Sequence, residues 1–253
     1  MRIKKLATTL LVATSAISML SGTSTWSTAS NAKLHIFDQD SYIYNNSWGG
    51  GTNGEQGIRR RDGHADFQWN WKGSGNSVQA YPSVVRGWHW DSPRFSTHKL
   101  PISVAGPPSC KMQSKLKYAF NATGSYDVAY DLWAATDRNL SWRTHPSLEV
   151  MIWGEHQDAN PAGTPVSTVS IAGHNWTVWK GSGAFGGPVV SFVSDRDALR
   201  HPLDLMQFVH EAAGAHVDSR LRLISTEFGV EVEHGVGSAT IRDWSERRTA
   251  SCR

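Results

Sequence analysis

Residues 148–153, with the sequence LEVMIW, place a glutamate on an unusual face of a strand. Side chains alternate between the two faces of a strand, so the leucine, valine and isoleucine share one face while Glu149, Met151 and Trp153 share the other. An outward, solvated strand explains a single glutamate, but it does not explain the methionine and tryptophan beside it. A concave sheet face lined by aromatic side chains explains all three. Glu149 is therefore a candidate for nucleophilic or acid–base chemistry.

A second acidic segment lies at residues 227–233, with the sequence EFGVEVE. Glu227, Glu231 and Glu233 point to one face of this predicted strand, together with Gly229. A glycine between two glutamates would leave room for a ligand to approach the sheet. The alternative interpretation is an acidic edge strand that is kept soluble by its charge. Taken alone, the segment does not decide between the two.

Two further segments carry polar and aromatic residues on one face. Asp131 and Trp133 share a face in AYDLW, and Asn46 and Trp48 share a face in YNNSW. The chain holds 12 tryptophans, whose flat apolar rings can stack on pyranose rings, while amides and carboxylates pair with hydroxyls. Such a face suits a sugar polymer. Two carboxylates add hydrolysis, because one can protonate the leaving oxygen while the other attacks the anomeric carbon or activates water.

The elements that must hold these residues are mostly strands. About twelve short β-rich segments recur along the chain, separated by turn clusters such as GGGTNG at residues 49–54. The exception is residues 201–216, where apolar residues recur at helical spacing and Pro202 suits a first helical turn. We expect an all-β fold, a β-jelly-roll sandwich of two antiparallel sheets with a concave substrate cleft and one packed helix.

The N-terminus has the three-part pattern of a secretory signal peptide. A basic start is followed by an apolar run to about Leu20 and then by small polar residues. We expect a signal peptide at residues 1–30 and a single catalytic domain at residues 31–253. Cleavage after Ser30 would remove three of 25 basic residues and none of the 22 acidic ones, which leaves no net charge. We therefore expect a secreted monomer with no nucleic-acid partner and no membrane association after cleavage. The RRRD run at residues 59–62 predicts a solvated loop.

Little in the sequence indicates a metal or redox centre. Cys110 and Cys252 could form one disulfide in an oxidising compartment or could stay as two thiols, and the sequence leaves both possibilities open. The segment GEHQD at residues 154–158 carries metal-ligating residue types, but we interpret it as a solvated turn. We expect no cofactor and no metal.

Four stretches together resemble glycoside hydrolase family 12, a group of secreted β-1,4-glucanases. They are YIYNNSWG at residues 42–49, YDLW at 130–133, EVMIW at 149–153, and FGVE at 228–231 followed by GVG at 235–237. Their order and spacing cover nearly all of the mature chain. The resemblance implies a β-jelly-roll with an open cleft on its concave sheet and a retaining double displacement that needs no metal.

The resemblance also implies roles for individual residues. Glu149 would be the nucleophile and Glu231 the general acid/base, while Asp131 would hydrogen-bond to the nucleophile and help to hold its charge state. Glu227 is the competing acid/base candidate, but the FGxE register favours Glu231. The residues expected to bind the sugar chain, the last two from a loop over one end of the cleft, are Asn46, Trp48, Met151, Trp133, Pro161 and Gly163.

The sequence therefore predicts an enzyme that cleaves internal β-1,4-glucosidic bonds of cellulose or a related β-glucan with retention of configuration. A xyloglucan-specific or mixed-linkage β-glucanase is the alternative within the same class, because substrate choice rests on cleft loops rather than on the catalytic residues. A non-catalytic, carbohydrate-binding sandwich is the alternative from another class. It would need the tryptophans but not the paired glutamates.

Overall fold

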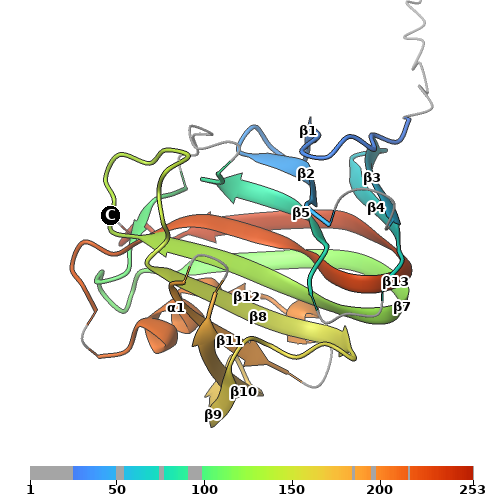
Figure 1. Cartoon of the computed structure of the whole chain (residues 1–253). Helices are drawn as coiled ribbons and strands as arrows, with labels where there is room; N and C mark the ends of the chain where they lie inside the picture. The colour runs from blue at the N-terminus through green and yellow to red at the C-terminus, as the bar shows by residue number, and fades with distance from the viewer. Residues whose placement is uncertain are drawn as a thin grey trace, which may run out of the picture.

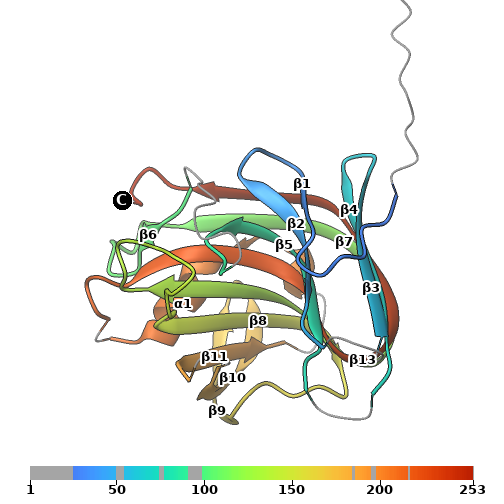
Figure 2. The same cartoon turned by 45° about the horizontal axis from the view of Figure 1, so that its top comes forward.

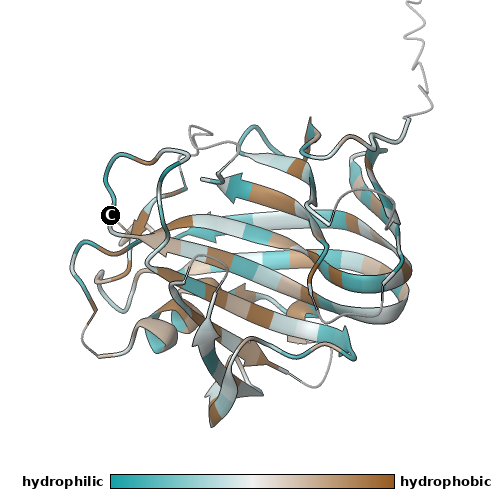
Figure 3. Cartoon of the chain, viewed as in Figure 1, coloured by the Kyte–Doolittle hydropathy of each residue, from teal (hydrophilic) through white to brown (hydrophobic). Residues whose placement is uncertain are grey.

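Strands make up most of the chain that the computed structural model describes, which comprises residues 25–49, 54–73, 77–90, 99–183, 186–194, 198–215 and 217–252 (Figure 1). Hydrophilic and hydrophobic residues alternate along the long strands (Figure 3), as expected for strands with one buried face. The strands are β1 (Lys33–His35), β2 (Ser41–Ser47), β3 (Gly54–Arg61), β4 (His64–Trp71), β5 (Ala80–Gly87), β6 (Ile102–Ser103), β7 (Met112–Ala135), β8 (Leu148–Gln157), β9 (Thr164–Ile171), β10 (His174–Ser182), β11 (Pro188–Val193), β12 (Leu203–Asp204) and β13 (Arg222–Arg248). The helix α1 spans Leu205–Ala213. The predicted all-β class with one packed helix is confirmed.

Strands β7 and β13 pair antiparallel along almost their whole lengths, from Ala135 opposite Arg222 to Met112 opposite Arg248. They contain 24 and 27 residues, far more than an ordinary strand, so each passes from one layer of the sandwich into the other. The first part of β13 pairs with β5 and a later part pairs with β4. The two layers therefore share two strands and form one continuous hydrogen-bonded sheet (Figure 2).

The change of layer occurs where Gly124 of β7 lies opposite Gly235 of β13. Both glycines have positive φ angles, 97° and 115°, and a Cβ on Gly235 would lie 1.9 Å from the carbonyl oxygen of Thr123. The register of β13 also shifts between Val232 and His234, and such irregularities bend a strand. Glycine is required here by both the backbone conformation and the close approach of the two chains.

The concave layer follows the strand order β1-β2-β5-β13-β7-β8-β11-β10-β9. Its pairs are antiparallel except for β8 and β11, which run parallel with Glu149 opposite Val189. The sequence predicted antiparallel sheets only, so this parallel pair was not expected. It arises because the β9–β10 hairpin precedes β11 in the chain and lies on its outer side. β11 thus returns to the edge of β8 in the same direction.

Residues 54–61 form strand β3, which includes residues 59–61 of the run that the sequence predicted to be a solvated loop. Ile58 is fully buried. Arg59 and Arg61 both pair with Asp66 of the neighbouring strand β4, at 2.8 Å and 3.0 Å. The arginine run is therefore part of the β3–β4 hairpin, in which one carboxylate on the paired strand holds two of its three side chains.

Helix α1 covers the core side of β8, β11 and β10. The ring of Phe208 packs edge-on against Trp176 and Phe192, with centroids 5.0 Å and 5.2 Å away. The helix is shorter than the predicted range 201–216, because residues 203–204 pair with β7 as β12. Pro202 therefore lies before the helix and not in its first turn. Asp204 is the N-cap, and its carboxylate accepts a hydrogen bond from the Met206 amide.

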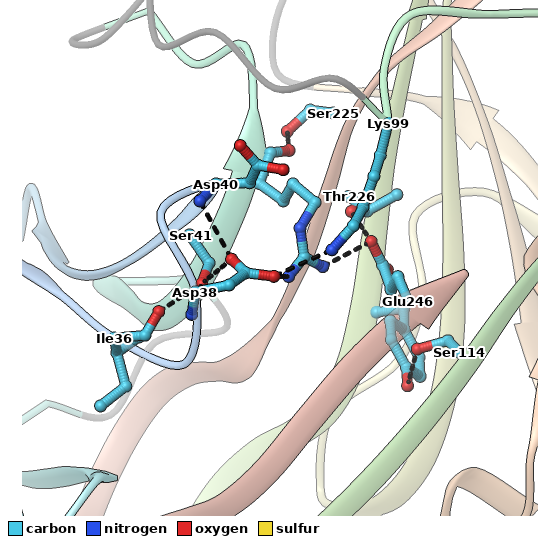
Figure 4. A network of polar contacts seen from close by, with 11 residues as sticks. Ile36, Asp38, Asp40, Ser41, Lys99, Ser114, Ser225, Thr226 and Glu246 are labelled. Carbon is cyan, nitrogen blue, oxygen red and sulfur yellow. Dashed lines mark hydrogen bonds and ion pairs between the residues drawn. The ribbon is translucent and has the colours of Figure 1, made fainter. Parts of the chain in front are cut away.

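A buried arginine of β5 pairs with two carboxylates in a polar network that includes Asp38, Lys99, Thr226 and Glu246 (Figure 4). Arg86 has no exposed side-chain surface and pairs with Glu246 at 2.7 Å and Asp38 at 2.9 Å. Thr226 donates a hydrogen bond to Glu246, and Lys99 pairs with Asp38. Although burial opposes the shift, the hydrogen bond from Lys99 and the charge of Arg86 lower the pKa of Asp38 to about 2. Removing one partner would leave a buried charge without an opposite charge nearby, so the stability of each ion pair depends on the other residues of the network.

The two ends of the described chain are fastened to the sheet. Cys110 and Cys252, separated by 142 residues, form a disulfide, which answers the question that the sequence left open. The predicted signal peptide lies mostly outside the described residues, but Ser27 exchanges two backbone hydrogen bonds with Ile58. Cleavage after Ser30 would remove that pairing. Within the described residues, no helix has the length and apolar character that crossing a bilayer requires.

Candidate active site

The concave face holds a cleft of about 650 Å³. It is lined by side chains from β2, β5, β7, β8 and β13 and from nearby loops. Seven of the nine residues that the sequence assigned to a site lie in it together: Asn46, Trp48, Asp131, Trp133, Glu149, Met151 and Glu231. Pro161 and Gly163 are not among the lining residues. Their neighbours Asn160 and Ala162 are, so the predicted loop reaches the cleft through different side chains.

The predicted alternation of β8 is confirmed. Leu148, Val150 and Ile152 belong to the main hydrophobic core. Glu149, Met151 and Trp153 line the cleft. The core-facing side chains fix the register of the strand, because a slip by one residue would turn the glutamate into the core.

Strand register brings acidic side chains from β7, β8 and β13 to one place. Glu149 lies opposite Trp133 on β7, and Asp131 of β7 lies opposite Met151 on β8. Glu227 and Glu231 of β13 lie opposite Asp131 and Asp127 of β7. Positions that are more than 70 residues apart in the chain therefore share one sheet face, as the mechanism inferred from the resemblance requires.

The cleft is strongly acidic. Its lining residues include six carboxyl side chains and, within the described part of the chain, no lysine or arginine. Among the described residues that line the cleft, only His89 could carry a positive charge. The six carboxyl side chains are those of Asp127, Asp131, Glu149, Glu227, Glu231 and Glu233. Such a cleft favours uncharged ligands that offer hydroxyl groups over anionic ones.

Burial and mutual repulsion keep protons in this cluster. Burial raises the pKa of Glu149 from 4.5 to about 8, and repulsion from Glu231 adds to the shift. Burial raises the pKa of Glu231 to about 7, although a hydrogen bond with Asp127 works in the opposite direction. Burial likewise raises the pKa of Glu227 to about 8. Because the groups interact, successive ionisations belong to the cluster rather than to single residues. The cluster thus holds carboxylic acid and carboxylate side by side near neutral pH.

One of the two carboxyl oxygens of Asp131 does not make the predicted hydrogen bond to Glu149. Oδ1 of Asp131 is buried and has no hydrogen-bond partner among the described residues. Burial raises the pKa of Asp131, and the charge of Glu149 raises it further. Asp131 and Glu149 thus interact through charge, and the hydrogen bond between them stays a prediction.

Two glycines shape the cleft in different ways. A Cβ on Gly183 would lie 2.2 Å from Oε2 of Glu149, so a side chain at this position would displace the carboxylate. A Cβ on Gly229 would lie 2.9 Å from the ring of Tyr81 and 2.4 Å from the carbonyl oxygen of Pro82. The space left by Gly229 is thus filled by β5, and the expectation that it admits a ligand is wrong.

Aromatic side chains form the walls. Trp48 is 53% exposed, yet its Nε1 donates a hydrogen bond of 2.8 Å to the carbonyl of Val78, which holds the ring in place. At another part of the wall, Trp90 packs edge-on against Trp88 and Trp133, with centroids 4.5 Å and 4.9 Å away. Rings that are held in place and partly exposed provide stacking surfaces for a ligand with little loss of conformational entropy.

Sequence reasoning missed some lining residues. Asp127 follows the same alternation as Asp131 and could have been found from it, since four residues separate them on one strand. Tyr81 and Trp90 come from β5 and the segment that follows it, and no spacing relates them to the acidic strands. No group of three or more histidine, cysteine, aspartate or glutamate side chains within the described residues is arranged to hold a metal ion.

Comparison with known proteins agrees with this geometry. The model of glycosyl hydrolase family 12 matches residues 40–247. Endoglucanase S of Pectobacterium parmentieri is 32% identical over 221 residues, which cover 84% of this chain and 83% of that protein. The native family 12 xyloglucanase from Bacillus licheniformis has a similar structure, with a TM-score of 0.81 and 31% identity, covering 89% of this chain and 100% of that one.

A third similar protein is named as an inactive one. The inactive glycoside hydrolase XLP1 of Phytophthora nicotianae is 26% identical over 177 residues, which cover 66% of this chain and 68% of that protein. The likeness to the xyloglucanase confirms the predicted jelly-roll fold. The family match spans both acidic strands and the walls of the cleft, and the chain therefore belongs to glycosyl hydrolase family 12.

Proposed function

We propose that this protein is a retaining endo-β-1,4-glucanase that acts on cellulose or a related soluble β-glucan. The observation that carries the proposal is the meeting of Glu149 and Glu231, from separate strands, in a cleft walled by tryptophans. An open groove accepts the middle of a polymer, which supports internal cleavage.

The reaction would proceed by double displacement. Glu231 donates a proton to the glycosidic oxygen while the Glu149 carboxylate attacks the anomeric carbon, which gives a covalent glycosyl-enzyme and releases the leaving chain. Glu231, now a carboxylate, takes a proton from water as the water attacks the same carbon and frees Glu149. The first step needs Glu149 ionised, although its pKa is the higher of the two. The repulsion between Glu149 and Glu231 allows one negative charge on these two groups and opposes the second, and that charge must lie on Glu149 when the sugar reacts.

Xyloglucan or mixed-linkage glucan is the alternative substrate. The relation to the xyloglucanase from Bacillus licheniformis favours xyloglucan, whereas the relation to endoglucanase S favours an unbranched chain. Both readings use the same carboxyls. The substrates are separated by whether side branches fit against the cleft walls.

Reducing-sugar release from neutral hydroxyethyl cellulose, mixed-linkage β-glucan and tamarind xyloglucan, measured side by side, tests the proposal. We expect hydrolysis of at least one polymer and a fast fall in its solution viscosity. Glu149→Gln should lose several orders of magnitude in turnover while it still binds the polymer. Glu155→Gln is the matched control, because Glu155 lies on the same strand outside the cleft and pairs with Arg200. Binding without hydrolysis in the unmodified protein would favour the carbohydrate-binding alternative.

Export is proposed for the same chain. The N-terminal pattern supports it, and so does the disulfide, since such bonds persist in oxidising compartments. N-terminal sequencing of protein collected from the medium of a bacterial host would locate the cleavage site. A mature protein that begins at Asn31 would match the sequence prediction, and retention of Ser27 would preserve its pairing with Ile58.

A further inference from the structure

The concave face continues beyond the cleft over β11, β10 and β9, the strands at the edge of the sheet farthest from β1 (Figure 1). Directly opposite residues of paired strands lie on the same face. Met151 of β8 lies opposite Ser191 of β11, and Ser191 lies opposite Trp179 of β10. Trp179 therefore shares the face of Met151, which lines the cleft. It lies two strands further out, roughly 10 Å away at the usual spacing of strands.

A loop crosses the concave face between the active site and Trp179. This crossing loop, residues 158–163, leads from the end of β8 to the start of β9. Near its beginning, Ala159 belongs to one hydrophobic cluster with Trp153 of β8. Near its end, a Cβ on Gly181 of β10 would lie 2.5 Å from the carbonyl group of Ala162. The loop thus runs obliquely from β8 to β10 and leaves the remainder of β10 on its far side.

Polar, exposed side chains surround Trp179 on the far side of the crossing loop. Trp176 and Val178 of β10 belong to the main hydrophobic core, so the residues that alternate with them face outward. Trp179 is partly exposed, and its neighbours on the same face of the β9–β10 hairpin are fully accessible to a ligand. The uncharged residues that share this face are Trp179, Thr177, Asn175, Thr168 and Ser170.

The direction of the cleft leads toward this surface. The strands that line the cleft are β2, β5, β13, β7, β8 and β11, which follow one another in the sheet. A polymer in the cleft therefore lies across the strands, and a chain that extends past β11 reaches β10 next. The retaining mechanism assigned to Glu149 and Glu231 leaves the surface around Trp179 without a role.

We propose that this surface of the β9–β10 hairpin, which we call the hairpin platform, binds the part of a β-glucan chain that extends out of the cleft past the crossing loop. This inference rests on the proposed function, because it concerns the same polymer. An indole ring offers a flat apolar face on which a pyranose ring can stack. The hydroxyl and amide groups beside Trp179 can donate hydrogen bonds to sugar hydroxyls and accept them. The platform therefore adds affinity for long chains and takes no part in bond cleavage.

Trp179→Ala tests the proposal on two substrates of different length. A short chromogenic cello-oligosaccharide ends within the cleft, whereas the neutral polymer that the protein hydrolyses fastest reaches the platform. Trp179→Ala should raise KM for the polymer about fivefold and leave both kcat and KM for the short substrate unchanged. Lys180→Ala is the matched control, because Lys180 is the next residue of β10 and is exposed on the opposite face. An unchanged KM for the polymer, or an equal loss on both substrates, overturns the proposal.

A second variant covers the case in which Trp179→Ala does not fold. Thr177 is exposed, and in Thr177→Arg the guanidinium group can lie over the neighbouring indole ring and cover it. Isothermal titration calorimetry on the Glu149→Gln protein measures binding without hydrolysis. Adding Thr177→Arg should weaken its binding of the polymer about fivefold and leave its binding of the short oligosaccharide unchanged. Equal affinity for the polymer with and without Thr177→Arg overturns the platform.

The platform and the proposed function fail differently. An unmodified protein that hydrolyses no β-glucan removes the proposed function, and the calorimetry on the polymer still decides whether the platform binds it. Hydrolysis of the polymer with a KM that Trp179→Ala does not raise removes only the platform.

Discussion

Replacing the proposed nucleophile should make the protein more stable at alkaline pH. The folded state raises the pKa of Glu149 from 4.5 to about 8, so between these values the folded chain holds a proton that the unfolded chain has lost. Stability then falls as pH rises through that window. At about 1.4 kcal/mol per pKa unit, the shift sets a ceiling of ~5 kcal/mol. Glu149 is only partly buried, and part of its pKa shift comes from repulsion by a neighbouring carboxyl. We therefore expect the free energy of unfolding of Glu149→Gln to exceed that of the unmodified protein by about 2 kcal/mol at alkaline pH.

Thermal unfolding at about pH 5 and about pH 8.5 checks this, because a gain of that size corresponds to roughly 5 °C in Tm for a domain of this length. The two proteins should unfold at similar temperatures at the acidic pH, which lies only slightly above the ordinary pKa of 4.5, so most of the destabilisation has not yet developed there. Only at the alkaline pH should Glu149→Gln be the more stable. Glu155→Gln, outside the cleft, should show no such gain. A Glu149→Gln protein that is equally stable or less stable than the unmodified protein at both pH values would refute the reasoning.

Three further predictions follow from the packing and the charge. Gly183→Ala places a methyl group 2.2 Å from Oε2 of Glu149, which must move, and should lower kcat by at least about tenfold, with little change in Tm; unchanged turnover in an initial-rate assay would contradict this. Arg86→Met leaves Glu246 buried without its partner and should reduce the free energy of unfolding in urea by about 3 kcal/mol, a prediction that a loss below measurement error would exclude. Carboxymethyl cellulose should be hydrolysed more slowly than a neutral cellulose derivative, increasingly so as pH rises and less so in high salt; a rate ratio independent of both pH and salt would show that the charge of the cleft does not act on the substrate.

Alternation along single strands could be predicted from the sequence because it depends on local geometry. The faces of Glu149 and Glu231 follow from the period of two in a strand, and the hydrophobic side chains opposite them fix which face is buried. The same reasoning failed at β3, where an arginine run resembled a solvated loop. Arg59 and Arg61 of this run pair with Asp66 on the neighbouring strand, and pairing between strands cannot be read from one of them. The helix was predicted but overextended, since residues 203–204 are held by β7.

By itself the sequence determined the class of fold, the acidic and aromatic faces and the chemistry that such faces support, because residue type and spacing act within a few residues. Only the tertiary structure decided which charged groups meet and which residues fill space. The pairing of Asp127 with Glu231, the filling of the Gly229 gap by Tyr81 and the approach of Gly183 to Glu149 each join segments that are distant in the chain. Burial then changes their chemistry, since a carboxyl ionises according to the charges and solvent around it rather than according to its neighbours in sequence.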